Sequence, residues 1–198
     1  GKAAEFLQPE NALRLPVPAH PFFIRHPDLG DFSMEFRFQI YDSTASGPLV
    51  SRLGTAWDAL SARLLTQGFQ VGLRRGKLVA RFENFFQSRG RYLSLEMDQG
   101  FPLEPDRWYH TAIRYAAATG LLEKRLDGIE EDRRFTTGDG TEHGVLYNAG
   151  FLPGHRAPLT LGEGFTGRLE GLRISTESDR RAVVHPFPDS ISAWTSTV

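Results

Sequence analysis

The chain has 198 residues with a formal net charge of −1, and 40% of its residues are hydrophobic and 12% aromatic. This apolar content excludes a disordered chain, and the nearly neutral charge excludes the strongly basic domain that nucleic-acid binding usually requires. The sequence contains no cysteine and no apolar run near the roughly 20 residues of a membrane span, so it predicts neither disulfides nor a spanning helix. We expect one domain over residues 1–198, with a core over about residues 12–176.

The N-terminal part of the chain predicts two short strands and then a long one. Residues 1–21 are punctuated by proline, which is confined to sheet edges, so residues 12–15 predict an edge strand and residues 22–24 a second short strand. Over residues 32–41 polar and apolar side chains alternate, as in a strand with one face in a core. The apolar face consists of Met34, Phe36, Phe38 and Ile40.

The next part of the chain predicts strands around one irregular segment. After a strand at residues 48–53, residues 56–65 break the β pattern, because Trp57, Leu60 and Leu64 recur at helical spacing. We expect a short helix within a loop there. The further strands expected in this part cover residues 69–73, 78–82 and 92–98, the first two joined by an Arg75-Gly76 turn.

The clearest pattern is a hairpin within residues 103–128. Its two arms, residues 108–115 and 121–128, are separated by a Thr-Gly turn, and the second arm ends in Asp-Gly. Apolar side chains occur on both faces of the first arm, so we expect a central strand with Trp108 buried in the sandwich. The two faces are Trp108, His110, Ala112 and Arg114 on one side and Tyr109, Thr111, Ile113 and Tyr115 on the other.

This hairpin also carries a resemblance to a known family. A Trp-aromatic-His-x-Ala-hydrophobic-x-Tyr strand, a Thr-Gly turn and a strand that ends in Asp-Gly resemble the laminin-G-like domains of the concanavalin A-like lectin/glucanase superfamily. The resemblance covers roughly residues 20–176 and departs from the family at Glu170, where Asp is usual. It implies an all-β, antiparallel two-sheet jelly-roll β-sandwich, which the recurring turn signals also favour. The flanking segments that fit the same pattern are residues 31–38, 158–162 and 165–174.

Two patterns bear on enzymatic chemistry. Residues 162–167 match a dinucleotide fingerprint by letter, but they continue into a strand where the fingerprint needs a helix, so we do not expect nucleotide binding. Glu96 and Asp98 are the best pair of carboxylates for glycoside hydrolysis, since their spacing places both on one strand face. The glucanases of the superfamily carry a third acid on that strand, which this chain lacks. We therefore expect a non-catalytic protein, with two solvent-facing acids as the ordinary interpretation.

Metal binding has one candidate segment. The six histidines lack the short spacings of a zinc site. Residues 138–142 resemble a calcium loop but supply only two acids, Asp139 and Glu142. Related domains sometimes hold calcium with backbone carbonyls completing the shell. Calcium is accordingly the one cofactor that the sequence suggests, with Asp139 and Glu142 as its candidate ligands.

A ligand site is expected in the long glycine-rich loop at residues 136–157, because irregular segments of this length are usually functional or mobile. A sugar needs an exposed aromatic ring to stack on and planar hydrogen-bonding groups around it. Trp57, with Asp58, is a second candidate. In the alternative interpretation, Tyr147 and Phe151 pin the loop onto the sandwich. The candidate ligand-binding residues of the loop are Tyr147, Asn148, Phe151, His155 and Arg156.

These observations favour a non-catalytic carbohydrate-binding module. Its partner would be a glycan or an extracellular protein and not nucleic acid, and the resemblance implies an exported protein that is extracellular, periplasmic or on the cell surface. A protein-recognition, adhesion or scaffolding module is the alternative, and a glycoside hydrolase or polysaccharide lyase the third possibility. Residues 185–198 predict a linker-like tail or closing segment. A basic cluster predicts either a solvated strand face or a patch for anionic glycan: Arg74, Arg75, Lys77, Arg81, Arg89 and Arg91.

Overall fold

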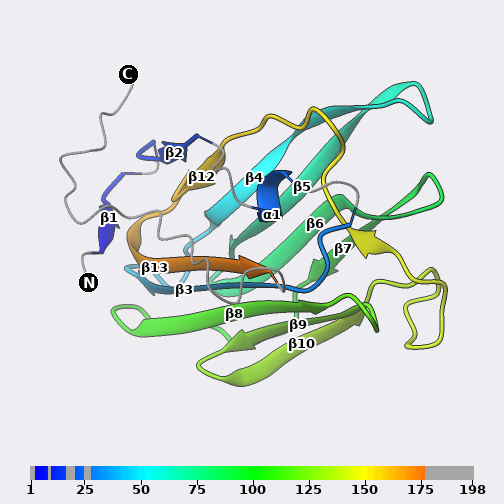
Figure 1. Ribbon diagram of the computed structural model, residues 1–198. Coiled ribbons are helices and arrows are strands. Elements are labelled where there is room, and N and C mark those ends of the chain that lie inside the picture. The colour runs from blue at the N-terminus through cyan, green and yellow to red at the C-terminus, as the bar shows by residue number, and fades with distance from the viewer. Residues whose placement is uncertain (1–2, 9, 17–20, 25–27, 177–198) are drawn as a thin grey trace.

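The computed structural model describes residues 3–8, 10–16, 21–24 and 28–176, which form the two-sheet antiparallel β-sandwich that the sequence predicts (Figure 1). The first sheet contains six strands in the order β1-β13-β3-β8-β9-β10. Their bounds are Ala4–Phe6 for β1, Gly167–Thr176 for β13, Phe32–Ile40 for β3, Trp108–Ala116 for β8, Leu121–Leu126 for β9 and Ile129–Phe135 for β10.

The second sheet is built around three strands of twelve residues each, β4, β5 and β6. Its strands follow the order β11-β6-β5-β4-β12-β2, and β7 also pairs with β6. The bounds are Asn148–Ala149 for β11, Lys77–Ser88 for β6, Arg63–Arg74 for β5, Gly47–Asp58 for β4, Leu159–Leu161 for β12, Leu13–Leu15 for β2 and Arg91–Met97 for β7.

Phenylalanine dominates the core between the sheets. The apolar face of β3 is buried as predicted, and Phe32 at the start of this strand lies 6.1 Å from Phe85 of the second sheet, between ring centroids. Phe85 lies at the centre of an aromatic cluster, with ring centroids 5.0 Å from Phe151 and 6.3 Å from Phe69. Edge-to-face pairs of this kind add about 0.5–1.5 kcal/mol each beyond the area that they bury. Because Phe32 of the first sheet also contacts Phe85, the cluster packs the two sheets against each other.

The alternating patterns predict most of the strands correctly. The edge strand expected at residues 12–15 corresponds to β2, the strand expected at residues 92–98 overlaps β7, and residues 103–128 contain the β8–β9 hairpin. Residues 69–82 lie in the β5–β6 hairpin, whose strands are longer than expected. The segment after Gly162 continues into β13, a strand and not a helix, so the nucleotide fingerprint lacks the helix that it needs.

The expected strand at residues 22–24 is wrong, because Pro21–Ile24 form a one-turn helix, α1. Phe22 and Phe23 are both buried, at 0% and 2% exposure. A strand would direct consecutive side chains to opposite faces, whereas a helical turn lets both rings enter the core. Within the described residues no helix is long and apolar enough to cross a membrane.

The expected helix at residues 56–65 is also wrong, because this segment is the turn of the β4–β5 hairpin. Trp57 lies opposite Leu64 in the ladder. The Asp58 carboxylate accepts the backbone N–H groups of Leu60 and Ser61 at 3.1 and 3.2 Å, which closes the turn. The helical spacing arose because two arms of one hairpin lie close in sequence.

Two further differences concern the first sheet. Trp108 is only half-buried and lies on the outer face, where the Arg37 guanidinium stands 5.4 Å from its ring, so it is not the core residue expected. The sequence pattern does not predict strand β10, since five of its seven residues are charged. The predicted tail at residues 185–198 lies outside the described residues.

Candidate functional site

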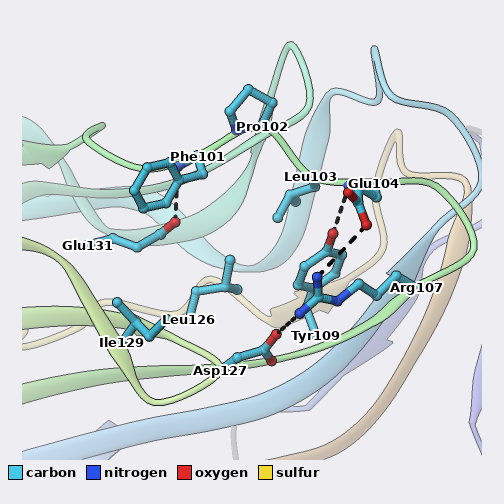
Figure 2. A pocket seen from close by; sticks show the side chains of 10 residues that line it. All are labelled: Phe101, Pro102, Leu103, Glu104, Arg107, Tyr109, Leu126, Asp127, Ile129 and Glu131. Carbon is cyan, nitrogen blue, oxygen red and sulfur yellow. Dashed lines mark hydrogen bonds and ion pairs between the residues drawn. The ribbon is translucent and has the colours of Figure 1, made fainter.

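An open hollow of about 180 Å³ lies between the β7–β8 connection and the β9–β10 hairpin (Figure 2). Two of its large apolar side chains are strongly exposed, Phe101 at 70% and Ile129 at 65%. Single exposed apolar residues are ordinary, but two that flank one hollow form an apolar surface open to a ligand. The lining residues are Phe101, Pro102, Leu103, Glu104, Arg107, Tyr109, Leu126, Asp127, Ile129 and Glu131.

The polar side of the hollow is organised by Arg107. Its Nη2 donates to Asp127 Oδ2 at 3.0 Å, and its Nη1 lies 3.8 Å from Glu104 Oε2. The guanidinium also stands over the Tyr109 ring, 4.9 Å from the centroid, and Figure 2 shows it across the hollow from Phe101. A guanidinium has five N–H donors, so Arg107 retains donors for a ligand after these contacts.

Local backbone geometry fixes this arrangement. Asp127 and Gly128 both have positive φ, 50° and 82°, which is the two-residue hairpin turn that Asp-Gly favours. Asp127 Oδ1 accepts the backbone N–H of His110 at 2.8 Å, so the carboxylate faces Arg107 in a fixed orientation. The Tyr109 hydroxyl accepts the backbone N–H of Glu104 at 2.7 Å and holds the connection against β8.

A buried ion pair lies behind the hollow, between β9 and β10. The side chains of Lys124 and Glu131 are 0% and 1% exposed, and Lys124 Nζ lies 3.4 Å from Glu131 Oε2. The ammonium also donates to the carbonyl oxygens of Leu78 and Gln99 at 2.6 and 2.5 Å. Burial lowers the pKa of Lys124, and the charge of Glu131 opposes that shift. The pair thus joins both sheets, since Leu78 belongs to β6.

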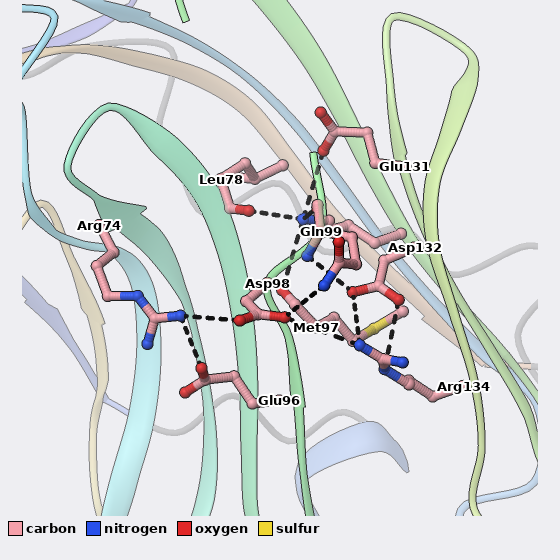
Figure 3. Close-up of polar contacts among 10 residues, drawn as sticks. Arg74, Leu78, Glu96, Met97, Asp98, Gln99, Glu131, Asp132 and Arg134 are labelled. Atoms are coloured by element: carbon pink, nitrogen blue, oxygen red, sulfur yellow. Dashed lines mark hydrogen bonds and ion pairs between the residues drawn. The ribbon is translucent and has the colours of Figure 1, made fainter. Parts of the chain in front are cut away.

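The same hairpin holds the wall of the hollow through backbone contacts (Figure 3). Asp132 Oδ2 accepts the N–H of Gln99 at 3.0 Å, and Glu131 Oε1 accepts the N–H of Phe101 at 3.2 Å. A Cβ at Gly100 would lie 2.6 Å from Glu131 Oε1, so glycine is needed where the connection crosses this carboxylate. Residues 99–101 are therefore anchored from behind while the Phe101 ring faces outward.

Comparison with known proteins addresses the fold. No family model and no curated protein sequence matches the chain. Among solved structures, mouse laminin α1 chain domains LG4-5 superpose with a TM-score of 0.55 at 15% identity, over 95% of this chain and 44% of that chain. The chain has a laminin-G-like, concanavalin A-like sandwich fold. It spans less than half of that two-domain laminin structure.

Two bacterial structures share this laminin-G-like sandwich. The CBM40 of the Ruminococcus gnavus IT-sialidase has a TM-score of 0.55 at 11% identity, over 90% of this chain and 93% of that chain. Domain 4 of AbnA, an extracellular arabinanase from Geobacillus stearothermophilus, was solved with arabinotriose and has a TM-score of 0.51 at 17% identity, over 94% and 73%. Identities this low establish the shared fold and nothing further.

In this sandwich, the long loop predicted to bind a ligand closes one end of the core. Phe151 is fully buried, and His155 is 7% exposed, with Nε2 donating to the Gln67 carbonyl oxygen at 2.9 Å. Arg52, also buried, stands 4.0 Å from the centre of the Phe151 ring, and burial lowers its pKa to about 10. Neither Phe151 nor His155 therefore presents a ring face at the surface.

The remaining loop candidates lie nearer the surface. Tyr147 is half-buried and packs against the core, as in the alternative interpretation of the loop. Asn148 lies in β11 and its Nδ2 is 3.4 Å from Asp28 Oδ2, while Arg156 is exposed. The structure does not bring these three residues to the hollow. Within the loop, Leu146 forms a single isolated bridge with Thr137.

The other predicted site residues are scattered. Trp57 is 56% exposed at the β4–β5 turn, where the Asp58 carboxylate is used by the turn itself. Glu96 and Asp98 both pair with Arg74, at 2.8 and 3.4 Å, on the outer face of the second sheet (Figure 3). Their shared guanidinium makes them part of a surface ion-pair network.

One of the two calcium candidates, Asp139, is hydrogen-bonded within the loop that contains it. Asp139 Oδ1 accepts the N–H and hydroxyl of Thr141 at 3.0 and 2.9 Å, and these bonds lower the pKa of Asp139. Glu142 is exposed. Within the described ranges no group of three or more His, Asp or Glu side chains could hold a metal ion. Calcium at this loop stays a prediction.

Proposed function

We propose that this chain is a carbohydrate-binding module and that it holds a glycan in the hollow beside the β9–β10 hairpin. The observation that carries the proposal is the pairing, in one hollow, of the exposed Phe101 ring with the ion-paired guanidinium of Arg107. A sugar ring has an apolar face and a rim of hydroxyls. Phe101 would stack on the face, while Arg107, Glu104 and Asp127 would bind the rim.

Two structural neighbours support the ligand class. The Ruminococcus gnavus CBM40 has been solved bound to α2,3 sialyllactose, and the Geobacillus stearothermophilus domain has been solved in complex with arabinotriose. Both proteins share the sandwich, and a sandwich presents its ligands on connections and sheet faces. On the same basis we propose an exported protein that works outside the cytoplasm, as a non-catalytic module.

The geometry favours weak binding. The hollow is open and presents one strongly exposed aromatic ring, so it covers one side of a sugar. A stacked ring and a few hydrogen bonds contribute little beyond the cost of association, and dissociation constants nearer millimolar than nanomolar follow. Weak single sites are useful when several copies act together.

The test is a glycan array that includes sialyllactoses and arabinotriose, followed by NMR titration of each hit. Phe101→Ala and Arg107→Ala should each weaken binding at least about tenfold, the loss of one stacking or charged contact. Trp57→Ala, which removes another exposed aromatic ring far from the hollow, should leave binding unchanged. Binding that survives Phe101→Ala but is lost in Tyr147→Ala would place the site on the long loop and overturn this proposal.

A further inference from the structure

A second surface lies where two hairpin turns meet, at the end of the sandwich formed by the β4–β5 and β6–β7 turns (Figure 1). A Cβ built at Gly90 would lie 3.5 Å from Leu60 Cδ1, so the two turns touch. Tyr92, at the start of β7, hydrogen-bonds to the Asp58 carboxylate, which links the turns a second time. Beneath them is a small apolar cluster of Ala56, Leu65, Leu152 and Tyr92.

Three large apolar side chains project from this end instead of packing. Trp57 is 56% exposed, Leu60 79% and Leu64 65%. Trp57 and Leu64 face each other across the ladder, and Leu60 occupies the turn between them. We call Trp57, Leu60 and Leu64 the apolar tip. Contiguous exposed apolar side chains mark surfaces that meet a partner or a membrane.

Arginines surround the apolar tip. Arg63 precedes Leu64, and Arg89 and Arg91 flank Gly90, which contacts Leu60. All three arginines are exposed, and none of them forms an ion pair with another residue in the described part of the chain. On the sheet faces, by contrast, exposed arginines such as Arg37 and Arg74 are paired with glutamates. The acid of the β4–β5 turn, Asp58, is buried.

We propose that the apolar tip and its three arginines dock this protein onto an anionic lipid surface. An interfacial site needs apolar side chains that enter the acyl boundary and basic groups that reach the phosphates, and Trp is favoured at that depth. The arginines carry the charge that complements anionic headgroups. A stable protein interface needs about 800 Å² on each partner, more than three side chains on a projecting turn can supply. A bilayer, in contrast, accepts a projecting tip.

This surface is separate from the proposed glycan site. Strand β5 begins at Arg63 beside the apolar tip and ends at Arg74, and the isolated bridge of Lys77 with Pro102 places the hollow at that far end. At about 3.3 Å per residue, the length of β5 separates the two surfaces by roughly 35 Å. The protein could therefore rest on a membrane and still present the hollow to a glycan.

The test is sedimentation of the whole chain with vesicles of phosphatidylserine and phosphatidylcholine, compared with pure phosphatidylcholine. The chain should partition onto the anionic vesicles, with a blue shift in the fluorescence of Trp57 that Trp57→Phe removes. Arg89→Ala and Arg91→Ala should each lower partitioning about fivefold, the usual contribution of one basic residue near an anionic surface. Leu60→Ser with Leu64→Ser should reduce it on both kinds of vesicle.

Matched controls separate docking from general charge and from misfolding. Arg173→Ala removes one exposed arginine from β13, and Val145→Ser removes one exposed apolar side chain from the long loop. Both should leave partitioning unchanged, and every variant should keep the wild-type melting temperature. Failure of the wild type to sediment, or equal losses in tip and control variants, would overturn the proposal. Binding to an acidic protein in place of vesicles would overturn it as well.

Discussion

The long loop at residues 136–157 and the short β7–β8 connection at residues 98–107 use their aromatic side chains in opposite ways. In the loop, Phe151 is fully buried and Tyr147 packs against the core. In the connection, Phe101 is 70% exposed. The length and glycine content of a segment therefore do not show whether its rings are accessible. The difference is whether the segment packs its own side chains into the core.

The loop must close an open end of the sandwich. Phe151 packs 6.0 Å from Phe22 and 5.0 Å from Phe85, and Arg52 donates to the carbonyl oxygens of Ala157 and His155 at 3.1 and 3.2 Å. The connection does not use an aromatic ring of its own for anchoring, because Lys124, Glu131 and Asp132 hold its backbone from behind. A segment anchored through its backbone leaves its side chains free for a ligand.

The largest loss of stability among the variants that test this comparison is expected at Phe151. Phe151→Ala should lower the free energy of unfolding by about 3–5 kcal/mol, because it leaves a cavity among Phe22, Phe69 and Phe85 and removes the ring under Arg52. Chemical denaturation with a matched Phe101→Ala variant measures the difference. An unchanged midpoint for Phe151→Ala would mean that the loop does not close the core.

A smaller loss of stability is expected when the buried ion pair of Lys124 and Glu131 is broken. Glu131→Gln should cost about 1–3 kcal/mol, since it removes the charge that faces a buried ammonium and weakens the acceptor for the Phe101 N–H. Hydrogen exchange at Gln99 and Phe101 should accelerate in the variant. Glu130→Gln, on the exposed part of the same strand, is the control and should change stability by less than about 0.5 kcal/mol. Equal effects at both positions would show that the connection is held in another way.

The cost of Glu131→Gln should also depend on pH. Burial lowers the pKa of Lys124 below its ordinary 10.5, so between the lowered pKa and 10.5 the folded state binds fewer protons than the unfolded state. Stability therefore rises with pH in that window. Without Glu131 the pKa of Lys124 falls further and the rise begins earlier, so the deficit of the variant should shrink as the pH approaches 10.5. A deficit that is constant with pH would argue against a charged Lys124.

The sequence predicts the parts of the fold in which alternation and burial coincide. Strand β3 alternates over nine residues and its apolar face is buried, and the β8–β9 hairpin lies within the predicted bounds. The pattern gives a wrong prediction at the β4–β5 turn, where apolar residues of two strands happen to have helical spacing. It also misses β10, because the charged residues of this strand are typical of a loop. The conformation of such segments depends on pairing with neighbouring strands. The periodicity of one segment carries no information about that pairing.

The candidate site was harder to predict because its residues are contributed by separate segments. Phe101 and Arg107 come from a connection, while Asp127 and Glu131 come from a hairpin some twenty residues later. One signal was available for Lys124, which shares the inward face of β9 with Leu122 and Leu126. A lysine on the apolar face of a strand indicates a buried ion pair when the next strand supplies acidic residues that can pair with it. Phe101 between Gly100 and Pro102 gave a second, weaker signal, since both neighbours disfavour a packed strand.

The smallest effect on stability is expected at Phe101 itself. With 70% of the residue exposed, Phe101→Ala removes little buried area and leaves no cavity, so the free energy of unfolding should change by less than about 0.5 kcal/mol. The backbone of residue 101 stays fixed, because its N–H is bonded to Glu131 and not through the ring. The ring is thus dispensable for folding in a protein that buries most of its other phenylalanines.

The contrast between the two phenylalanines then separates a structural ring from a ligand-binding one. Phe101→Leu provides the intermediate case, since it keeps apolar area but removes the flat face on which a sugar stacks. If the hollow binds glycan, Phe101→Leu should bind as weakly as Phe101→Ala in the NMR titration. Both variants should have the melting temperature of the wild type. If Phe101→Leu binds normally, apolar area alone suffices and the stacking argument fails. If Phe101→Ala melts lower by several degrees, the ring packs in solution and the connection resembles the long loop after all.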